Sequence, residues 1–443
     1  MKNFKNSGIE WLGEIPEHWE MVKIKYFANL YNGDSIKDSD KGKYCIADND
    51  TIPYIATKDI DIIFNSINYY NGMFIKKTDA NFKKAYKECI LLCIEGANAG
   101  KKIAILNQEV CFVNKLCCVK NKSTELNSKF LFYFFQGIFF QNNFFSNIKG
   151  LIGGVTPEQI GNFLFLLPPL KEQEQIANFL DEKCEKIQNF IEKKEKLLSL
   201  LQEQKQALIN ETITKGLDKN VKLKNSGIEW LGEIPEHWEV RKLKMLFSFG
   251  NGLNITKADF ISFGIPCISY GEIHSKYPCR LDLSVHKLPF VSETYLNDKP
   301  QSLLSKGDFV FADTSEDIEG SGNFTCIQSN IPLFAGYHTI ILRPKTQIYS
   351  LYFSFLFDSI FVRNQIREKV WGVKVFSITK SILKEVQCFI PPLKEQEQIA
   401  NFLDEKCEKI DSLITKIKKQ IELIKEYKTT LINEAVCGRM DLK

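Results

Sequence analysis

The sequence lacks an apolar run long enough to cross a membrane. Its longest apolar stretch, Phe130 to Phe140, is interrupted by Gln136 and is far shorter than the roughly 20 residues that a spanning helix needs. The opening residues MKNFKN run directly into polar sequence, so no signal peptide is expected. The 13 cysteines are expected to be reduced thiols. These features predict a cytoplasmic protein without membrane contact.

Motifs for catalysis and cofactor binding are also missing. The glycine pairs at 250–252 and 320–322 lack the third glycine of a dinucleotide loop, and no Walker-type lysine loop is found. The Pro-Pro pairs at 168–169 and 391–392 lack the neighbouring polar residue that would hold a flipped base. The five histidines show no zinc-hydrolase spacing. We therefore expect no catalytic residue, no metal and no cofactor.

The net positive charge is small and unevenly distributed along the chain. The formal net charge is +4. Residues 21–160 contain 18 Lys and Arg against 13 Asp and Glu, and residues 240–385 contain 17 against 13, whereas the rest of the chain is acidic. Binding to phosphate needs such an excess of cations. Two separate basic blocks are therefore compatible with nucleic acid, although many other proteins have excesses of this size.

An internal repeat is the main feature that the sequence does have. The stretch KNSGIEWLGEIPEHWE at 5–20 recurs unchanged at 224–239, and PPLKEQEQIANFLDEKCEKI at 168–187 recurs unchanged at 391–410. The blocks between these stretches share little sequence. Drift after a recent duplication would scatter the differences, whereas here the identity is confined to the flanks. The repeated flanking stretches are therefore predicted to have the same function in both copies, and the two variable blocks to have different functions.

The repeat divides the chain into six expected segments. Each block mixes short β-branched runs with glycine-rich loops and ends in one Phe-rich helix, which predicts a mixed α+β fold. The expected segments are an opening motif at 1–20, a first variable domain at 21–167, a first long helix at 168–216, a central motif at 217–239, a second variable domain at 240–390 and a second long helix at 391–443.

Both long helices contain a heptad pattern that continues beyond the identical residues. Gly216 and Gly438 are expected to stop them. With Ile176 taken as position d, the expected seam residues are Ile176, Leu180, Ile187, Phe190, Leu197, Leu201 and Leu208 in the first helix, and Ile399, Leu403, Ile410, Leu413, Ile417, Ile424, Tyr427 and Leu431 in the second.

A single helix over 171–214 would be roughly 66 Å long at about 1.5 Å per residue. Alone it would expose a broad apolar stripe, so it needs a partner. The simplest partner is the other copy, packed antiparallel about a pseudo-twofold axis with one variable domain at each end. The alternative is that each seam docks on a foreign subunit.

The PPLKEQEQIA run at 168–177 and 391–400, preceded by GEIPEHW at 13–19 and 232–238, resembles the specificity subunit of type I restriction-modification systems over essentially the whole chain. The resemblance implies two target-recognition domains that read a bipartite, asymmetric site in double-stranded DNA, with helices that fix the gap. It also implies two methyltransferase subunits and motor-endonuclease subunits as partners. S-adenosylmethionine, ATP and magnesium would belong to those partners. A fused methyltransferase-nuclease partner stays open.

Loop residues that could read bases or position the phosphate backbone occur in both blocks. Each one alone is more often an ordinary solvated residue, so the set carries more weight than its members. The candidates are Thr57, Lys58, Lys101, Lys102, Asn114, Lys115 and Lys149 in the first block, and Tyr270, His274, Thr314, Ser315, Glu316, Asp317, Tyr337, His338 and Lys374 in the second.

Two other interpretations stay open at this point. The chain could be a coiled-coil scaffold that displays two protein-interaction domains, in which case it would bind no duplex in a salt-dependent manner. It could also be a nuclease or methylase with unrecognised motifs, which would be active alone. The failed motif searches argue against the second of these.

Overall fold

A computed structural model of the chain describes residues 3–10, 12–148, 153–227, 232–276, 279–372 and 375–440. The chain forms two compact units. Unit 1 contains Met1–Lys196 and Ile417–Lys443, and unit 2 contains Leu197–Lys416. Within the described ranges, no helix is both long and apolar enough to span a bilayer. The cysteines all lie in these ranges and are free thiols.

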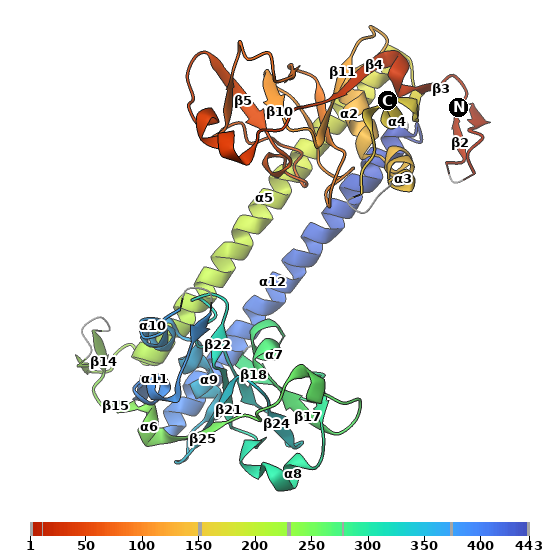
Figure 1. Cartoon of the computed structure of the whole chain (residues 1–443). Helices are drawn as coiled ribbons and strands as arrows, with labels where there is room; N and C mark the ends of the chain where they lie inside the picture. Colours follow the sequence, from red (N-terminus) through yellow and green to blue (C-terminus); the bar gives the residue numbers. More distant parts are fainter. Residues whose placement is uncertain are drawn as a thin grey trace. The chain divides into compact units, whose positions relative to one another are not determined.

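Unit 1 contains two four-stranded sheets, with strand orders β6-β5-β10-β7 and β4-β11-β8-β9 (Figure 1). One core cluster joins them through buried residues such as Ile55, Leu91 and Phe112. The sheet strands are β4 (Ala28–Asn32), β5 (Thr51–Ile55), β6 (Phe74–Lys76), β7 (Lys84–Ala85), β8 (Ile90–Cys93), β9 (Ile103–Ile105), β10 (Val110–Phe112) and β11 (Leu116–Asn121), with two-stranded pairs β1 (Phe4–Asn6) with β2 (Glu14–Pro16) and β3 (Glu20–Lys23) with β12 (Leu164–Leu167).

Unit 2 repeats this strand order and adds a fifth strand, β18, to one sheet; its strand orders are β19-β17-β24-β20 and β16-β25-β21-β23-β18. Its sheet strands are β16 (Phe247–Asn251), β17 (Ile265–Ile268), β18 (Cys279–Leu281), β19 (Phe290–Val291), β20 (Leu303–Leu304), β21 (Phe309–Ala312), β23 (Phe324–Ile327), β24 (Leu333–Ala335) and β25 (Thr339–Pro344), with pairs β13 (Leu223–Asn225) with β14 (Glu233–Pro235), β15 (Glu239–Lys242) with β27 (Gln387–Ile390) and β22 (Thr314–Ser315) with β26 (Phe376–Ser377). The expected mixed α+β class is confirmed.

The Phe-rich segment is one helix in the sequence-based prediction and two helices in the structure of each unit. Unit 1 has α2 (Ser128–Gln136) and α3 (Ile138–Ser146), and unit 2 has α9 (Ser350–Asp358) and α10 (Ile360–Arg367). At each break a backbone N–H leaves the helix ladder and donates to an asparagine of a long helix. Ile138 N donates to Asn433 Oδ1 at 2.7 Å, and Ile360 N donates to Asn210 Oδ1 at 3.0 Å.

The remaining helices are short. In unit 1 they are α1 (Ile24–Phe27), α4 (Pro157–Asn162) and the 3₁₀ turns η1 (Asp38–Tyr44) and η2 (Thr57–Asp59). In unit 2 they are α6 (Leu243–Leu246), α7 (Tyr270–Ser275), α8 (Tyr295–Asp298), α11 (Lys380–Lys384) and the turns η3 (Lys257–Asp259) and η4 (Pro300–Ser302). The helix α4 begins with a capping box, in which Thr156 and Gln159 each bond the backbone N–H of the other.

The repeated opening motif is fastened to the start of a long helix in each unit. In unit 1, Trp19 Nε1 donates to Glu172 Oε2 at 3.0 Å, and His18 Nε2 lies 2.8 Å from the same oxygen. Glu172 belongs to the first turn of α5 (Leu170–Lys215). In unit 2, Trp238 and His237 make the same contacts to Glu395. The identical stretches therefore form one clamp twice.

A buried glutamine completes this clamp. Gln173 is fully buried; its Oε1 accepts from Asn127 N at 2.8 Å, and its Nε2 donates to the carbonyls of Glu125 and Pro168. Gln396, in the first turn of α12 (Leu393–Val436), bonds Tyr349 N and the Pro391 carbonyl in the same way. Since unpaired buried backbone groups are costly, this glutamine ties the helix start to the variable domain.

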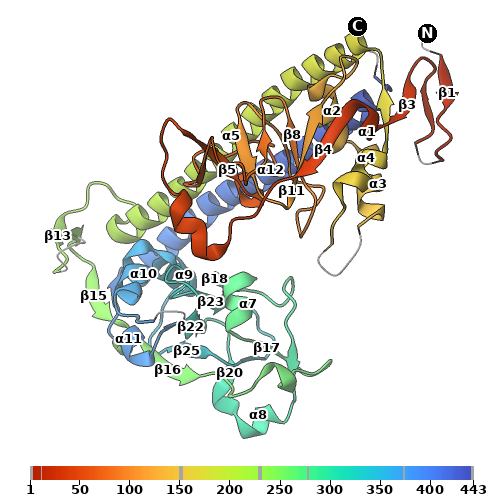
Figure 2. The same ribbon diagram turned by 45° about the horizontal axis from the view of Figure 1, so that its top comes forward.

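The end of the opposite long helix closes each clamp. A Cβ on Gly438, which follows α12, would lie 2.5 Å from the Pro16 ring and 3.0 Å from Trp19. Its φ of +71° also favours glycine. The start of α5 and the end of α12 therefore meet at Trp19, which makes the two helices antiparallel within unit 1 (Figure 2). Gly216 occupies the same position beside Trp238 in unit 2.

The seam between the long helices keeps the expected seven-residue repeat but differs at the d positions. Most of the expected a positions are buried or half-buried. Four expected seam residues are exposed instead, namely Phe190, Leu197, Leu413 and Tyr427. The buried stripe alternates between the a positions and the next residue after d, such as Ile191, Ile414 and Ile421. Three of seven positions are apolar, so the sequence alone could not tell which pair forms the contact.

The buried glutamine gives a stability prediction. Gln173→Leu should lower the free energy of unfolding by about 2–4 kcal/mol, because the Asn127 N–H and two carbonyls lose their partners in a buried site. Urea unfolding of the full chain measures this. Gln175→Leu, on the exposed side of the same turn, is the matched control and should change stability by less than about 0.5 kcal/mol. Equal effects of the two substitutions would contradict the clamp.

Candidate nucleic-acid interface

The candidate residues of unit 2 gather at one edge of its sheets. Tyr270 follows β17, the segment 314–317 follows β21, and Tyr337 and His338 follow β24. With His274 they border a cavity of about 750 Å³, which Tyr337 joins through its ring contact with Tyr270. Of the candidates in this block, Lys374 lies outside the described residues. Three segments that are distant in sequence, 270–274, 314–317 and 337–338, therefore meet at one hollow.

Aromatic rings pack together beside this hollow. The ring centroid of Tyr270 lies 5.6 Å from that of Tyr337, 5.4 Å from that of His338 and 6.2 Å from that of His274. Edge-to-face packing of this kind holds the rings in fixed orientations. Burial and nearby Glu272 raise the pKa of Tyr337, so its phenol remains protonated at neutral pH.

Carboxylates surround the rim. The segment 315–322 contains Glu316, Asp317 and Glu319, all exposed. Asp317 Oδ1 accepts from Gly320 N and shapes the turn, whereas Glu316 has no hydrogen-bond or ion-pair partner among the described residues. His338 Nδ1 lies 3.1 Å from Asp313 Oδ1. This rim can accept hydrogen bonds from the amino groups of bases, and it repels phosphate.

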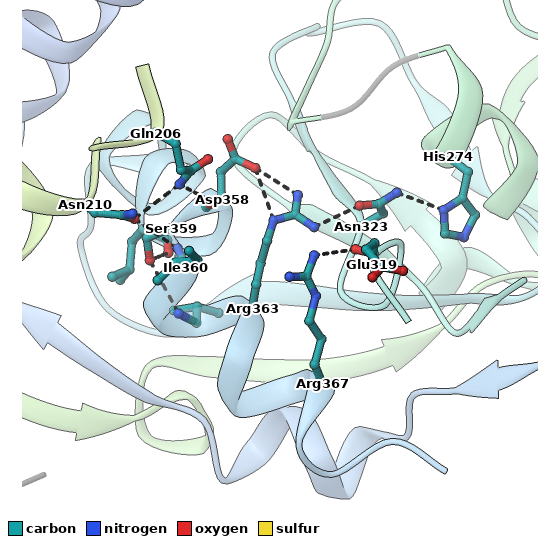
Figure 3. Close-up of polar contacts among 12 residues, drawn as sticks. Gln206, Asn210, His274, Glu319, Asn323, Asp358, Ser359, Ile360, Arg363 and Arg367 are labelled. Carbon is teal, nitrogen blue, oxygen red and sulfur yellow. Dashed lines mark hydrogen bonds and ion pairs between the residues drawn. The ribbon is translucent and has the colours of Figure 1, made fainter. Parts of the chain in front are cut away.

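A polar chain lies behind the hollow (Figure 3). Arg363 of α10 is paired with Asp358, and its Nη1 donates to Asn323 Oδ1 at 2.9 Å. Asn323 Nδ2 lies 2.9 Å from His274 Nδ1, and His274 Nε2 lies 2.8 Å from the Thr314 carbonyl oxygen. Burial, together with the like charge of Arg363, lowers the pKa of Arg367. The Arg367 guanidinium donates to the Glu319 carbonyl.

The candidate residues of unit 1 lie at the matching edge and are mostly basic. Lys102 Nζ donates to the Thr57 carbonyl at 2.8 Å, and Lys115 pairs with Glu95 at 3.3 Å. Four of these candidates are exposed, namely Lys58, Lys101, Asn114 and Lys115. Lys149 lies outside the described residues.

Strand register shows which residues of the two edges correspond. In unit 1, Cys93 N donates to the carbonyl of Lys102. In unit 2, Ala312 N donates in the same way to the carbonyl of Asn323. In the same way, Ile94 N bonds the Lys115 carbonyl, and Asp313 N bonds that of His338. Because β5 and β10 pair in parallel, as β17 and β24 do, the residues that follow them also correspond. The matched positions are Thr57 with Tyr270, Lys102 with Asn323, and Lys115 with His338.

Sequence reasoning missed three residues of the unit 2 edge. Asn323 occupies the position of Lys102, and aligning the two blocks on their strands would have found it. Arg363 belongs to α10, in the Phe-rich segment, from which no candidate residue was chosen. Trp371, which is 88% exposed, precedes β26, the strand that pairs with β22, and had no sequence signal beyond being an aromatic residue.

Comparisons with known proteins identify the family. The model of the type I restriction modification DNA specificity domain matches residues 16–200 and 235–423. The chain belongs to this family. It is a DNA specificity subunit of a type I restriction-modification system, which is the non-catalytic subunit. The expected resemblance is therefore confirmed.

Individual relatives match over nearly their whole length. The type I restriction enzyme MjaVIII specificity subunit of Methanocaldococcus jannaschii is 26% identical over 97% of this chain and 94% of its own. The EcoKI specificity subunit of Escherichia coli K12 is 22% identical over 97% and 90%. Among solved structures, a chain of a type I restriction-modification system has a TM-score of 0.72 at 16% identity, covering 96% of this chain and 99% of its own. The HsdS subunit of Thermoanaerobacter tengcongensis has a TM-score of 0.51 at 17% identity over 96% and 98%.

The unit 1 edge gives a prediction on salt dependence. Lys58→Gln should weaken DNA binding of the assembled complex equally for all sequences and reduce the slope of log affinity against log salt by about 1, because an exposed lysine outside the loop 96–102 contributes one phosphate contact. Lys186→Gln, on the exposed side of α5, is the control and should leave the slope unchanged. An effect limited to one target sequence would contradict a phosphate contact.

Proposed function

We propose that each unit of this specificity subunit reads one half of a bipartite, asymmetric DNA site. The reading surface of each unit is the edge at which the parallel strand pair ends, β5 with β10 in unit 1 and β17 with β24 in unit 2. The long helices α5 and α12 fix the number of unread base pairs between the halves.

The contrast between identical clamps and opposite edges carries this proposal. The loop 96–102 of unit 1 has two lysines and no acid, whereas the matching loop 315–323 of unit 2 has three acids and no lysine. Lysine donates to the acceptors of guanine, and carboxylates accept from the amino group of cytosine. Two edges of opposite chemistry require two different half-sites, so the target is asymmetric.

The doubled clamp also supports the expected partners. Two copies of one sequence-identical surface offer two equivalent docking positions, which fits two methyltransferase subunits in the complex. Motor-endonuclease subunits would join the same assembly for cleavage. The methyl donor, ATP and magnesium would be bound by those partners, because the motifs for binding them are missing from this sequence.

A block exchange tests the half-site assignment. Replacing residues 21–160 with the corresponding block of another specificity subunit should change one half of the methylated sequence and leave the other half intact, because the opening motifs and the long helices are unchanged. Sequencing of methylated DNA measures the outcome.

The reciprocal exchange of residues 240–385 is the matched control and should change only the other half. An exchange that alters both halves, or neither, would refute the modular assignment.

A further inference from the structure

Both ring nitrogens of His274 are engaged inside the protein. Nε2 lies 2.8 Å from the carbonyl oxygen of Thr314, and a carbonyl can only accept, so Nε2 carries a proton. Nδ1 lies 2.9 Å from the amide Nδ2 of Asn323, and this amide nitrogen can only donate, so Nδ1 accepts. The contacts therefore select the neutral tautomer with its proton on Nε2.

The orientation of Asn323 is itself determined. Its Oδ1 accepts from Arg363 Nη1 at 2.9 Å, and a guanidinium has no acceptor. Flipping the amide would place two donors against each other at Arg363 and leave Nδ1 of His274 without a donor. Asp358 holds the guanidinium through two contacts at 2.8 and 3.2 Å. The His274 tautomer therefore follows from the position of Arg363.

This chain of contacts reaches the long helix within unit 2. Gln206 Nε2 of α5 donates to the Asp358 carbonyl at 3.3 Å, and Asn210 Oδ1 accepts from Ile360 N at the break between α9 and α10. Figure 3 shows the order of these side chains from α5 to the reading edge. The break that anchors the variable domain on the clamp thus also anchors Arg363.

We propose that His274 is a positioning residue that holds the segment 314–320 in its reading geometry through the Thr314 carbonyl and does not itself contact a base. This inference rests on the proposed reading role of the unit 2 edge. It reassigns one expected DNA-binding residue and leaves direct readout to neighbours on the hollow, above all Glu316, Tyr270 and His338.

In unit 1, a lysine takes the place of the His274–Asn323 pair in tying two loops of the reading edge together. Lys102, which corresponds to Asn323, donates directly to the Thr57 carbonyl, and Thr57 corresponds to Tyr270. The first edge is therefore tied without a histidine. Changes to the His274 chain should affect only the half-site that unit 2 reads, so the other half-site serves as an internal control.

Imidazole ¹⁵N spectroscopy of the full chain tests the tautomer directly. The five histidines are assigned by single substitutions. In the unaltered protein at neutral pH, His274 should show a protonated Nε2 and an unprotonated Nδ1. In Asn323→Asp a carboxylate faces Nδ1, so the ring should become an imidazolium. A proton on Nδ1 in the unaltered protein would overturn the proposal.

The positioning role is tested in the assembled methyltransferase complex by measuring its affinity for the target and for single-base variants of each half-site. The ratio of these affinities is the discrimination at that half-site. His274→Leu should reduce discrimination at the unit 2 half-site roughly tenfold, comparable to the loss of one base contact. His274→Gln should stay within about threefold, because its amide can still donate to Thr314 and accept from Asn323. Unchanged discrimination at the other half-site shows that the complex is assembled and that unit 1 is intact.

The possible results separate the two proposals. Equal losses in His274→Leu and His274→Gln would mean that the ring itself contacts a base, and retention of discrimination in His274→Leu would mean that the contact is unimportant. Either result overturns the positioning role. If the unaltered complex showed no discrimination at the unit 2 half-site, the proposed function would be refuted. The tautomer measurement would still test the His274 contacts independently of that result.

Discussion

The contact of an indole N–H with a carboxylate at the start of a long helix is the interaction on which each unit depends. Trp19 and Trp238 are both fully buried, and each donates to the glutamate of the first helical turn. The adjacent buried glutamine then pairs backbone groups of the variable domain. Loss of the glutamate would leave the buried indole N–H unpaired, and loss of the glutamine would leave buried backbone groups unpaired. The same requirement acts on both copies of these stretches.

This constraint leaves the reading edges free to differ. The clamp uses the start of one long helix and the end of the other. Each variable domain attaches to it at a helix break through an asparagine of a long helix, Asn433 in unit 1 and Asn210 in unit 2. The clamp residues Trp19, Glu172 and Gln173, with their counterparts in unit 2, lie outside the loops that form the reading edges. Lysines can therefore occupy one edge, and carboxylates with aromatic rings the other, while the frame beneath remains the same.

Much of this organisation could be predicted from the sequence. The repeats located the clamp, and the glycines at 216 and 438 marked the helix ends, because each signal is local. The exposed d positions such as Phe190 could not be foreseen, since three apolar positions per heptad allow two seams. The break at Gly137 was missed for a related reason: it depends on Asn433, almost 300 residues away. Asn323 and Arg363 act through contacts that form only in the folded unit.

The most direct test of the account is to sequence the methylated DNA of cells that carry the complete system, with this subunit unaltered and with four residues inserted into both long helices near Leu197 and Ile421. The account predicts a bipartite motif whose two halves keep their sequences while the unread gap lengthens, because four residues add about one turn to each helix. A continuous motif, or an altered half-site with an unchanged gap, would contradict it.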